Sequence, residues 1–131
     1  MNDEKSLAPR LSTVSTFIIY WIPPFACGTC IFYFSSLPGT ICPSPFFQAD
    51  KVFHLGEYGI LAYFLARALA YHHLERKALF LTVCFICVIY GVSDELHQYF
   101  VPDRCPSFMD LLADGVGSSL GTGVYITQRK T

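Results

Sequence analysis

The sequence has little charge and, over one long stretch, none. Asp, Glu, Lys and Arg make up 15% of the 131 residues, against about 25% in an ordinary soluble domain. No charged residue occurs between Leu11 and Ala49. Hydrophobic residues account for 53% of the chain and include 12 Phe and 8 Tyr, which is more apolar surface than a small water-soluble core can bury. We therefore expect a membrane protein rather than a soluble domain.

Other absences narrow the class further. The formal net charge is only -1, so overall charge gives no reason to expect nucleic acid as a partner. The chain has no internal repeat or low-complexity tract, and its length suits a single domain over residues 1–131. A cleavable signal peptide is disfavoured, because the first apolar run is too long and no small-residue cleavage site closes it.

The apolar segments predict four helices. They lie at about residues 13–34, 51–70, 77–98 and 108–127, and each is close to the ~20 residues that cross a bilayer. The pair Pro23-Pro24 lies inside the first segment, where a membrane helix tolerates proline better than a soluble helix does. We predict an all-α fold, a polytopic membrane protein built as a four-transmembrane-helix bundle.

The positive charges predict the orientation of this bundle. With four spans, the N-terminus, the loop between the second and third helices and the C-terminus share one side. That side holds seven of the nine Lys and Arg residues, and only Lys51 and Arg104 lie on the other. Because Lys and Arg are enriched on the cytoplasmic side, we expect both termini in the cytoplasm and a multi-pass protein of the inner or plasma membrane.

This orientation gathers the acids at the outer face. Seven of the ten Asp and Glu residues fall there, and four-residue helical steps put several of them on shared faces. Asp50, His54 and Tyr58 share one face, and Asp94 shares another with Gln98. The predicted ligand-binding residues are Asp50, Lys51, His54, Tyr58, Asp94, Glu95, His97, Gln98, Arg104, Asp110 and Asp114.

Two interpretations of this cluster compete. Acids in the first turn of a membrane helix sit among lipid headgroups and favour the helix dipole, which suits Asp50 and Asp110. His54 and Asp114, however, lie about 6 Å deeper, and ionisable groups at that depth usually face a bundle interior or a wet cavity. We therefore favour a functional cleft over a structural polar cluster.

The chemistry of the cleft stays open at this point. Histidine with carboxylates is a ligand set for a divalent cation, but no compact metal motif is present. Crowded carboxylates also share protons and supply acid/base pairs. Catalytic candidates are His54, Asp94, Glu95, Asp110 and Asp114; no metal ligand is assigned, and a divalent metal stays one alternative beside acid/base and pure binding roles.

The same residues carry a family resemblance. The runs Asp50-Lys51-x-x-His54-x-x-x-Tyr58, Asp94-Glu95-x-His97-Gln98 followed by Pro102-x-Arg104, and Asp110-x-x-x-Asp114-x-x-Gly117-x-x-x-Gly121 resemble the signature of the VanZ-like family, as does Ser35-Ser36-Leu37-Pro38. The resemblance covers about residues 15–125. Asp103 departs from the family pattern, which often has Gly there.

The resemblance implies a role in the cell envelope. The family's namesake is an accessory protein linked to teicoplanin resistance, so the expected partners are the lipid membrane and a lipid-linked cell-wall precursor or lipophilic glycopeptide, with no nucleic acid. An intramembrane enzyme of lipid or phosphoester chemistry using the Asp, Glu and His cluster is the first alternative. A structural or cation- and proton-handling protein is the second. The resemblance does not say whether the protein is an enzyme.

Two cysteines form a last hypothesis. Cys42 and Cys105 are the only cysteines outside the apolar helices, and the predicted topology puts both in outer loops, where an oxidising compartment permits a disulfide. Such a bridge would need Cα atoms about 4.4–6.8 Å apart, and would tie the first two helices to the last two above the polar cluster.

Overall fold

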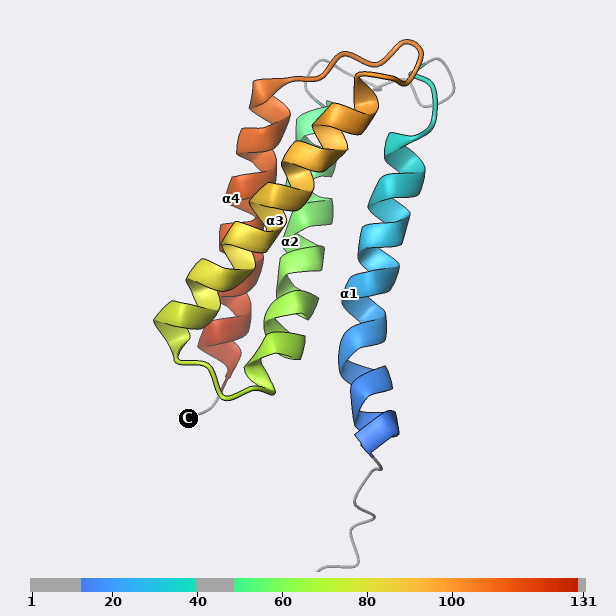
Figure 1. Cartoon of the computed structure of the whole chain (residues 1–131). Helices are drawn as coiled ribbons and strands as arrows, with labels where there is room; N and C mark the ends of the chain where they lie inside the picture. The colour runs from blue at the N-terminus through green and yellow to red at the C-terminus, as the bar shows by residue number, and fades with distance from the viewer. Residues whose placement is uncertain (1–12, 40–48, 130–131) are drawn as a thin grey trace, which may run out of the picture.

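Four helices account for most of the described chain. The computed structural model describes residues 13–39 and 49–129, and within them no residue is in a strand. The helices are α1 (Thr13–Ser35), α2 (Ala49–Ala70), α3 (Arg76–Gln98) and α4 (Phe108–Gln128), shown in Figure 1. Each end lies within two residues of the range predicted from the sequence. The all-α prediction is confirmed.

Local sequence explains where these helices start and stop. The side chain of Ser107 accepts a hydrogen bond from the Met109 backbone N–H at 3.2 Å and caps α4, as a serine at this position usually does. Asp50 and Asp110 lie in the first turns of α2 and α4, where the helix dipole favours a negative charge. Helix α1 continues through Pro23 and Pro24 without a break.

The arrangement brings distant acids to one end of the bundle. Figure 1 shows the last turns of α1 and α3 beside the first turns of α2 and α4, while the C-terminus lies at the opposite end. We call the end of the bundle where α1 and α3 finish and α2 and α4 begin the acidic end. It carries Asp50, Glu57, Asp94, Glu95, Asp110 and Asp114. In the described residues α1 contacts α2 and α3 but not α4. The three later helices therefore form the tight part of the bundle.

Glycines bring α2 and α4 into backbone contact. A Cβ atom added at Gly117 would collide with the carbonyl of Leu55, and one added at Gly121 would collide with the carbonyl of Gly59. The Gly117-x-x-x-Gly121 spacing thus allows close packing, and small residues at such contacts are typical of membrane helix pairs. This contact holds the inner face of α4 against α2 just below the acidic end.

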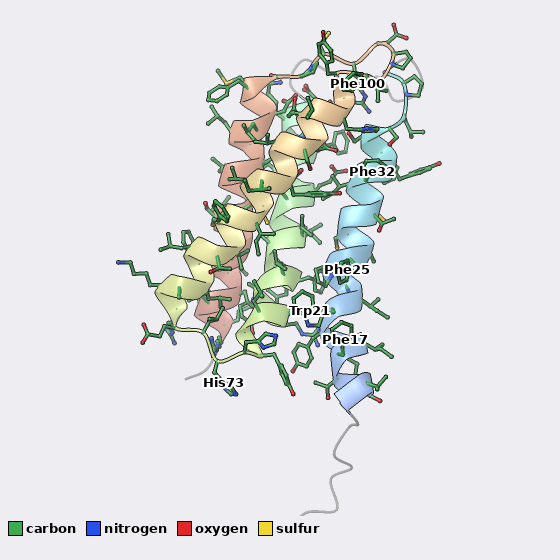
Figure 2. The ribbon with its side chains drawn as sticks, in the orientation of Figure 1. Phe17, Trp21, Phe25, Phe32, His73 and Phe100 are labelled. Atoms are coloured by element: carbon green, nitrogen blue, oxygen red, sulfur yellow. The ribbon has the colours of Figure 1, made fainter. Side chains whose placement is uncertain are left out.

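The outer surface of the helices is apolar. Among the described helices, Val14–Ser35 and Arg76–Gln98 are long and apolar enough to cross a membrane. Large side chains such as Phe17, Phe25 and Phe85 are 58%, 66% and 68% exposed. Figure 2 shows Phe17, Trp21, Phe25 and Phe32 spaced along α1. Exposed apolar area on this scale indicates an apolar environment or a partner surface.

Candidate functional site

A buried histidine–carboxylate pair links α2 to α4. The Nδ1 atom of His54 lies 2.9 Å from Oδ1 of Asp114, and the two residues are 8% and 0% exposed. An ionised carboxylate only accepts hydrogen bonds, so the Nδ1–H of His54 is the donor. Nε2, the other ring nitrogen, takes no part in this hydrogen bond.

A second link between the same helices runs through Lys51. Its Nζ donates to Oδ1 of Asp110 at 2.9 Å and to Oδ2 of Asp50 at 3.1 Å. Asp110 is 4% exposed. The single positive charge of Lys51 is thus shared by two carboxylates. Because Asp110 and Asp114 are four residues apart on α4, and Lys51 and His54 three apart on α2, the two links stack one turn apart.

A polar cavity of about 270 Å³ opens beside these pairs, between α1 and the α2–α3 pair. Its lining combines carboxylates, one histidine and one guanidinium with a few apolar side chains. The lining residues are Ile31, Phe34, Ser35, Asp50, Phe53, His54, Glu57, Asp94, Gln98 and Arg104. Five of the predicted ligand-binding residues thus line the cavity: Asp50, His54, Asp94, Gln98 and Arg104. Asp114 lies behind them, hydrogen-bonded to His54.

The acidic end also holds unsatisfied hydrogen-bonding capacity. In the described part of the chain, five buried side-chain atoms have no hydrogen-bond partner: Ser35 Oγ, Tyr58 OH, Asp94 Oδ1, Glu95 Oε1 and Asp114 Oδ2. Ser35 and Asp94 line the cavity, Tyr58 and Asp114 lie beside His54, and Glu95 contacts the start of α4. An unsatisfied buried polar atom costs about 1–3 kcal/mol, and buried polar atoms in native proteins normally have a partner or an ordered water or ion.

Arg104 fastens the loop before α4 to the end of α1. Its Nε donates to the carbonyl of Leu37 and its Nη2 to the carbonyl of Phe34, both at 3.1 Å. These contacts satisfy carbonyls that the end of a helix leaves without intrahelical partners. They also explain why Ser35-Ser36-Leu37-Pro38 and Arg104 occur together in the motif.

The turn before Arg104 adopts a left-handed backbone. Asp103 has φ 59°, a conformation that glycine adopts freely and aspartate tolerates better than most residues. A Cβ on Gly39 would collide with the carbonyl of Asp103. The backbones of two segments far apart in the sequence are therefore in direct contact here. Asp103 therefore lies at a position whose backbone conformation favours glycine, the residue that the VanZ-like pattern often has there.

Three predicted residues have other surroundings than the cavity. His97 faces α1: its Nε2 lies 3.0 Å from Ser36 Oγ and its ring stacks on Phe32 with centroids 4.5 Å apart. Tyr58 is fully buried with its ring 6.4 Å from that of His54. Glu95 accepts from the Ser107 backbone N–H at 2.7 Å and points toward α4. The structure thus separates His97 from the His54 side of the site.

Sequence reasoning missed two polar residues of the cavity lining. Glu57 lies one helical step from His54 and lines the cavity, and its three-residue spacing from His54 was the available signal. Ser35 lines it as well and is 6% exposed, although it was singled out only as part of a motif. Cys42 lies outside the described residues and Cys105 is exposed, so the proposed disulfide stays a prediction.

An apolar groove continues from the polar cavity along the bundle. It measures about 400 Å³ and runs between α1 and the α2–α3 pair. Its lining residues are Trp21, Pro24, Phe25, Gly28, Thr29, Phe32, Leu61, Leu65, Ile86, Cys87 and Tyr90. On α2 and α3 the groove begins about one turn beyond the cavity and continues away from the acidic end, whereas on α1 the two linings meet at Ile31 and Phe32. A polar chamber and an apolar groove therefore follow each other along the same helix interface.

One further grouping has metal-ligand character. His54, Glu95 and Asp110 each offer one ligand atom, and these three atoms lie within 4.8 Å of one another. They come from α2, α3 and α4. The grouping overlaps the catalytic candidates named from the sequence, and imidazole with carboxylates suits divalent transition metals.

A protein-family model confirms the family resemblance of the sequence. The family model described as VanZ/LLP1 matches residues 6–129. The chain belongs to the VanZ/LLP1 family. No curated protein and no solved structure matches it.

Membership of the VanZ/LLP1 family is consistent with the exposed apolar surface of the helices lying in a membrane. The match covers nearly the whole chain, and two helices of this VanZ/LLP1 protein are apolar enough to span a membrane. Family and helices together indicate a membrane accessory protein. The predicted membrane association is supported at this level.

Proposed function

We propose that this protein binds an amphiphilic ligand of the cell envelope, a lipid-linked wall precursor or a lipophilic glycopeptide, at the outer face of the inner or plasma membrane. In this proposal all four helices span the membrane, the whole chain forms one VanZ-like unit and both termini are cytoplasmic. The acidic end then faces outward, as the distribution of Lys and Arg favours.

One observation carries this proposal: the polar cavity and the apolar groove are consecutive parts of one interface. The cavity supplies carboxylates, Gln98 and Arg104 for a polar head, and the groove supplies aromatic and aliphatic walls for a chain. Ligand sites are commonly apolar with a few placed polar groups that fix orientation. A lipid anchored in the groove would present its headgroup to the cavity.

The unpartnered atoms of the cavity indicate what that headgroup offers. Asp94 is 3% exposed with Oδ1 unpartnered, and Ser35 Oγ is likewise buried without a partner. A carboxylate requires a donor, so a sugar hydroxyl, amide or ammonium group fits beside Asp94. Arg104 has a third guanidinium nitrogen beyond the two that bind α1 carbonyls, and guanidinium groups suit phosphate.

Co-purified lipid tests the proposal. The protein is extracted in mild detergent, and its bound lipids are quantified by mass spectrometry against the bulk membrane. We expect polyprenyl-linked precursors to be enriched on the native protein and at least several-fold less on Asp94→Asn. Glu75→Gln, an exposed site before α3, is the matched control. Binding of teicoplanin to the purified protein is measured in parallel. The proposal would be contradicted if all three proteins carried the lipid profile of the bulk membrane and the native protein bound no teicoplanin.

An enzymatic role is the second candidate, and the His54–Asp114 hydrogen bond favours it. A histidine whose Nδ1–H is held by a buried carboxylate has the arrangement of a general base with its orienting acid. Release of inorganic phosphate from polyprenyl diphosphate by reconstituted protein, abolished in His54→Gln, would establish this role. Absence of release beside measurable lipid binding would support the accessory role alone.

A further inference from the structure

Three helices of the acidic end each contribute one side chain to a single small volume. The ligand atoms of His54, Glu95 and Asp110 lie within 4.8 Å of one another. Ligand atoms around one tetrahedral zinc ion are about 3.4 Å apart, given metal–ligand distances of about 2.0–2.2 Å. Side-chain movements of about 1 Å would bring the three atoms to that spacing.

The atoms around this volume lack the partners that buried atoms normally have. Oε1 of Glu95 is buried and unpartnered, and so is Oδ2 of Asp114, a residue with no exposed area. His54 is 8% exposed, and its only hydrogen bond in the described chain uses Nδ1. An imidazole nitrogen outside that hydrogen bond and buried carboxylate oxygens are the kinds of ligand atom that a divalent cation binds.

The local charge also fits a divalent ion. Glu95, Asp110 and Asp114 contribute three negative charges, and Lys51 contributes one positive charge through its 2.9 Å contact with Asp110. Lys51 is shared with Asp50, so these three carboxylates outnumber the lysine charge in contact with them. A divalent cation would offset this excess of negative charge, and buried charges without a partner are costly.

We propose that His54, Glu95 and Asp110 bind one divalent transition-metal ion, Zn²⁺ or Mn²⁺, and that Asp114 orients the His54 ring through its hydrogen bond to Nδ1. One imidazole with two carboxylates suits these ions better than Ca²⁺ or Mg²⁺, which prefer oxygen ligands alone. A ring nitrogen held by a carboxylate is the usual support of a metal-bound histidine. This metal site shares His54 with the cavity, but the proposal does not rest on the proposed lipid binding.

Metal titration of the full-length protein tests this site. Detergent-solubilised protein is stripped with a chelator, and Zn²⁺ or Mn²⁺ alone is titrated by isothermal calorimetry, with stoichiometry checked by elemental analysis. We expect one ion per chain. Glu95→Gln keeps an oxygen that can accept from Ser107 but removes the charge, and it should abolish stoichiometric binding, as should Asp110→Asn.

Two further variants separate ligands from supporting residues. Asp114→Asn should weaken the affinity by about 10–100-fold without abolishing binding, the size typical of a partner behind a metal ligand. Glu75→Gln makes the same chemical change as Glu95→Gln at an exposed position and should leave the affinity unchanged. Circular dichroism identifies any variant that fails to fold. Native protein without stoichiometric metal, or folded Glu95→Gln and Asp110→Asn that both bind like the native protein, would overturn the proposal.

Discussion

The backbone contact between α2 and α4 is open to a direct test at Gly117. A Cβ atom built on Gly117 lies 3.0 Å from the Cα of Leu55 and closer still to the Leu55 carbonyl oxygen. Two carbons in contact need about 3.5–4.0 Å. Because the opposing atoms are backbone, they cannot rotate away, and the helices must separate by at least about 0.5 Å. We expect Gly117→Ala to lower the free energy of unfolding by about 1–3 kcal/mol.

Gly115 provides the matched control on the same helix. A Cβ there meets nothing within 4 Å, so Gly115→Ala should leave the stability unchanged or raise it by up to about 1 kcal/mol through helix propensity. Both variants add one methyl group and differ only in what that group meets. Unfolding of the detergent-solubilised protein in increasing SDS, followed by far-UV circular dichroism, gives both free energies. Equal midpoints for the two variants would refute the α2–α4 contact.

The same substitution reaches the site through the same two helices. Asp114 lies one turn before Gly117 on α4 and holds Nδ1 of His54 at 2.9 Å. A separation of 0.5 Å or more would take this pair beyond the usual range of about 2.7–3.2 Å. We therefore expect Gly117→Ala to weaken Zn²⁺ binding and to lower the stability. Gly115→Ala should lower neither.

Three other predictions concern the loop and the topology. Asp103→Gly should raise the free energy of unfolding by up to about 1 kcal/mol and Asp103→Ala should lower it by a similar amount, because φ at this position is 59°; SDS unfolding measures both. Arg104→Lys should lower it by about 1–3 kcal/mol through loss of the two-carbonyl contact with α1, whereas Arg76→Lys at the other end should change it by less than about 0.5 kcal/mol. An alkaline phosphatase reporter, active only outside the cytoplasm, should be active when fused near Pro45 and inactive when fused after Thr131; the reverse result would contradict the topology.

The helices were predictable because their signal is local. Four apolar segments of bilayer length predict four helices whatever the tertiary packing, and the ends agree within two residues. The inward orientation of His54 and Asp114 was predictable from their depth, since both lie about one turn inside the first acid of their helix. Such residues face inward when the alternative is lipid.

Neighbour relations between helices were not predictable in the same way. His97 lies beside Asp94 and Gln98 in the sequence, yet its ring stacks on Phe32 and contacts Ser36. Helical spacing places a residue on a face, but it does not say which helix covers that face. Glu57 was missed for the same reason, because α1 and not α4 closes the side of α2 on which it lies.

Apart from His54, the two proposed ligands use different residues, so different substitutions should affect them. The cavity lies on the α1 side, where α1 contacts only α2 and α3 in the described chain. The trio with Glu95 and Asp110 lies on the side of α4, which glycines hold against α2. Substitutions that loosen α1, such as Arg104→Lys, should therefore alter lipid binding and spare the metal. Substitutions at Gly117 should alter the metal first, because the ligands come from both helices that the glycine brings together. If both classes of variant changed lipid and metal binding by the same factor, the acidic end would have to act as one site, with His54 as its shared centre.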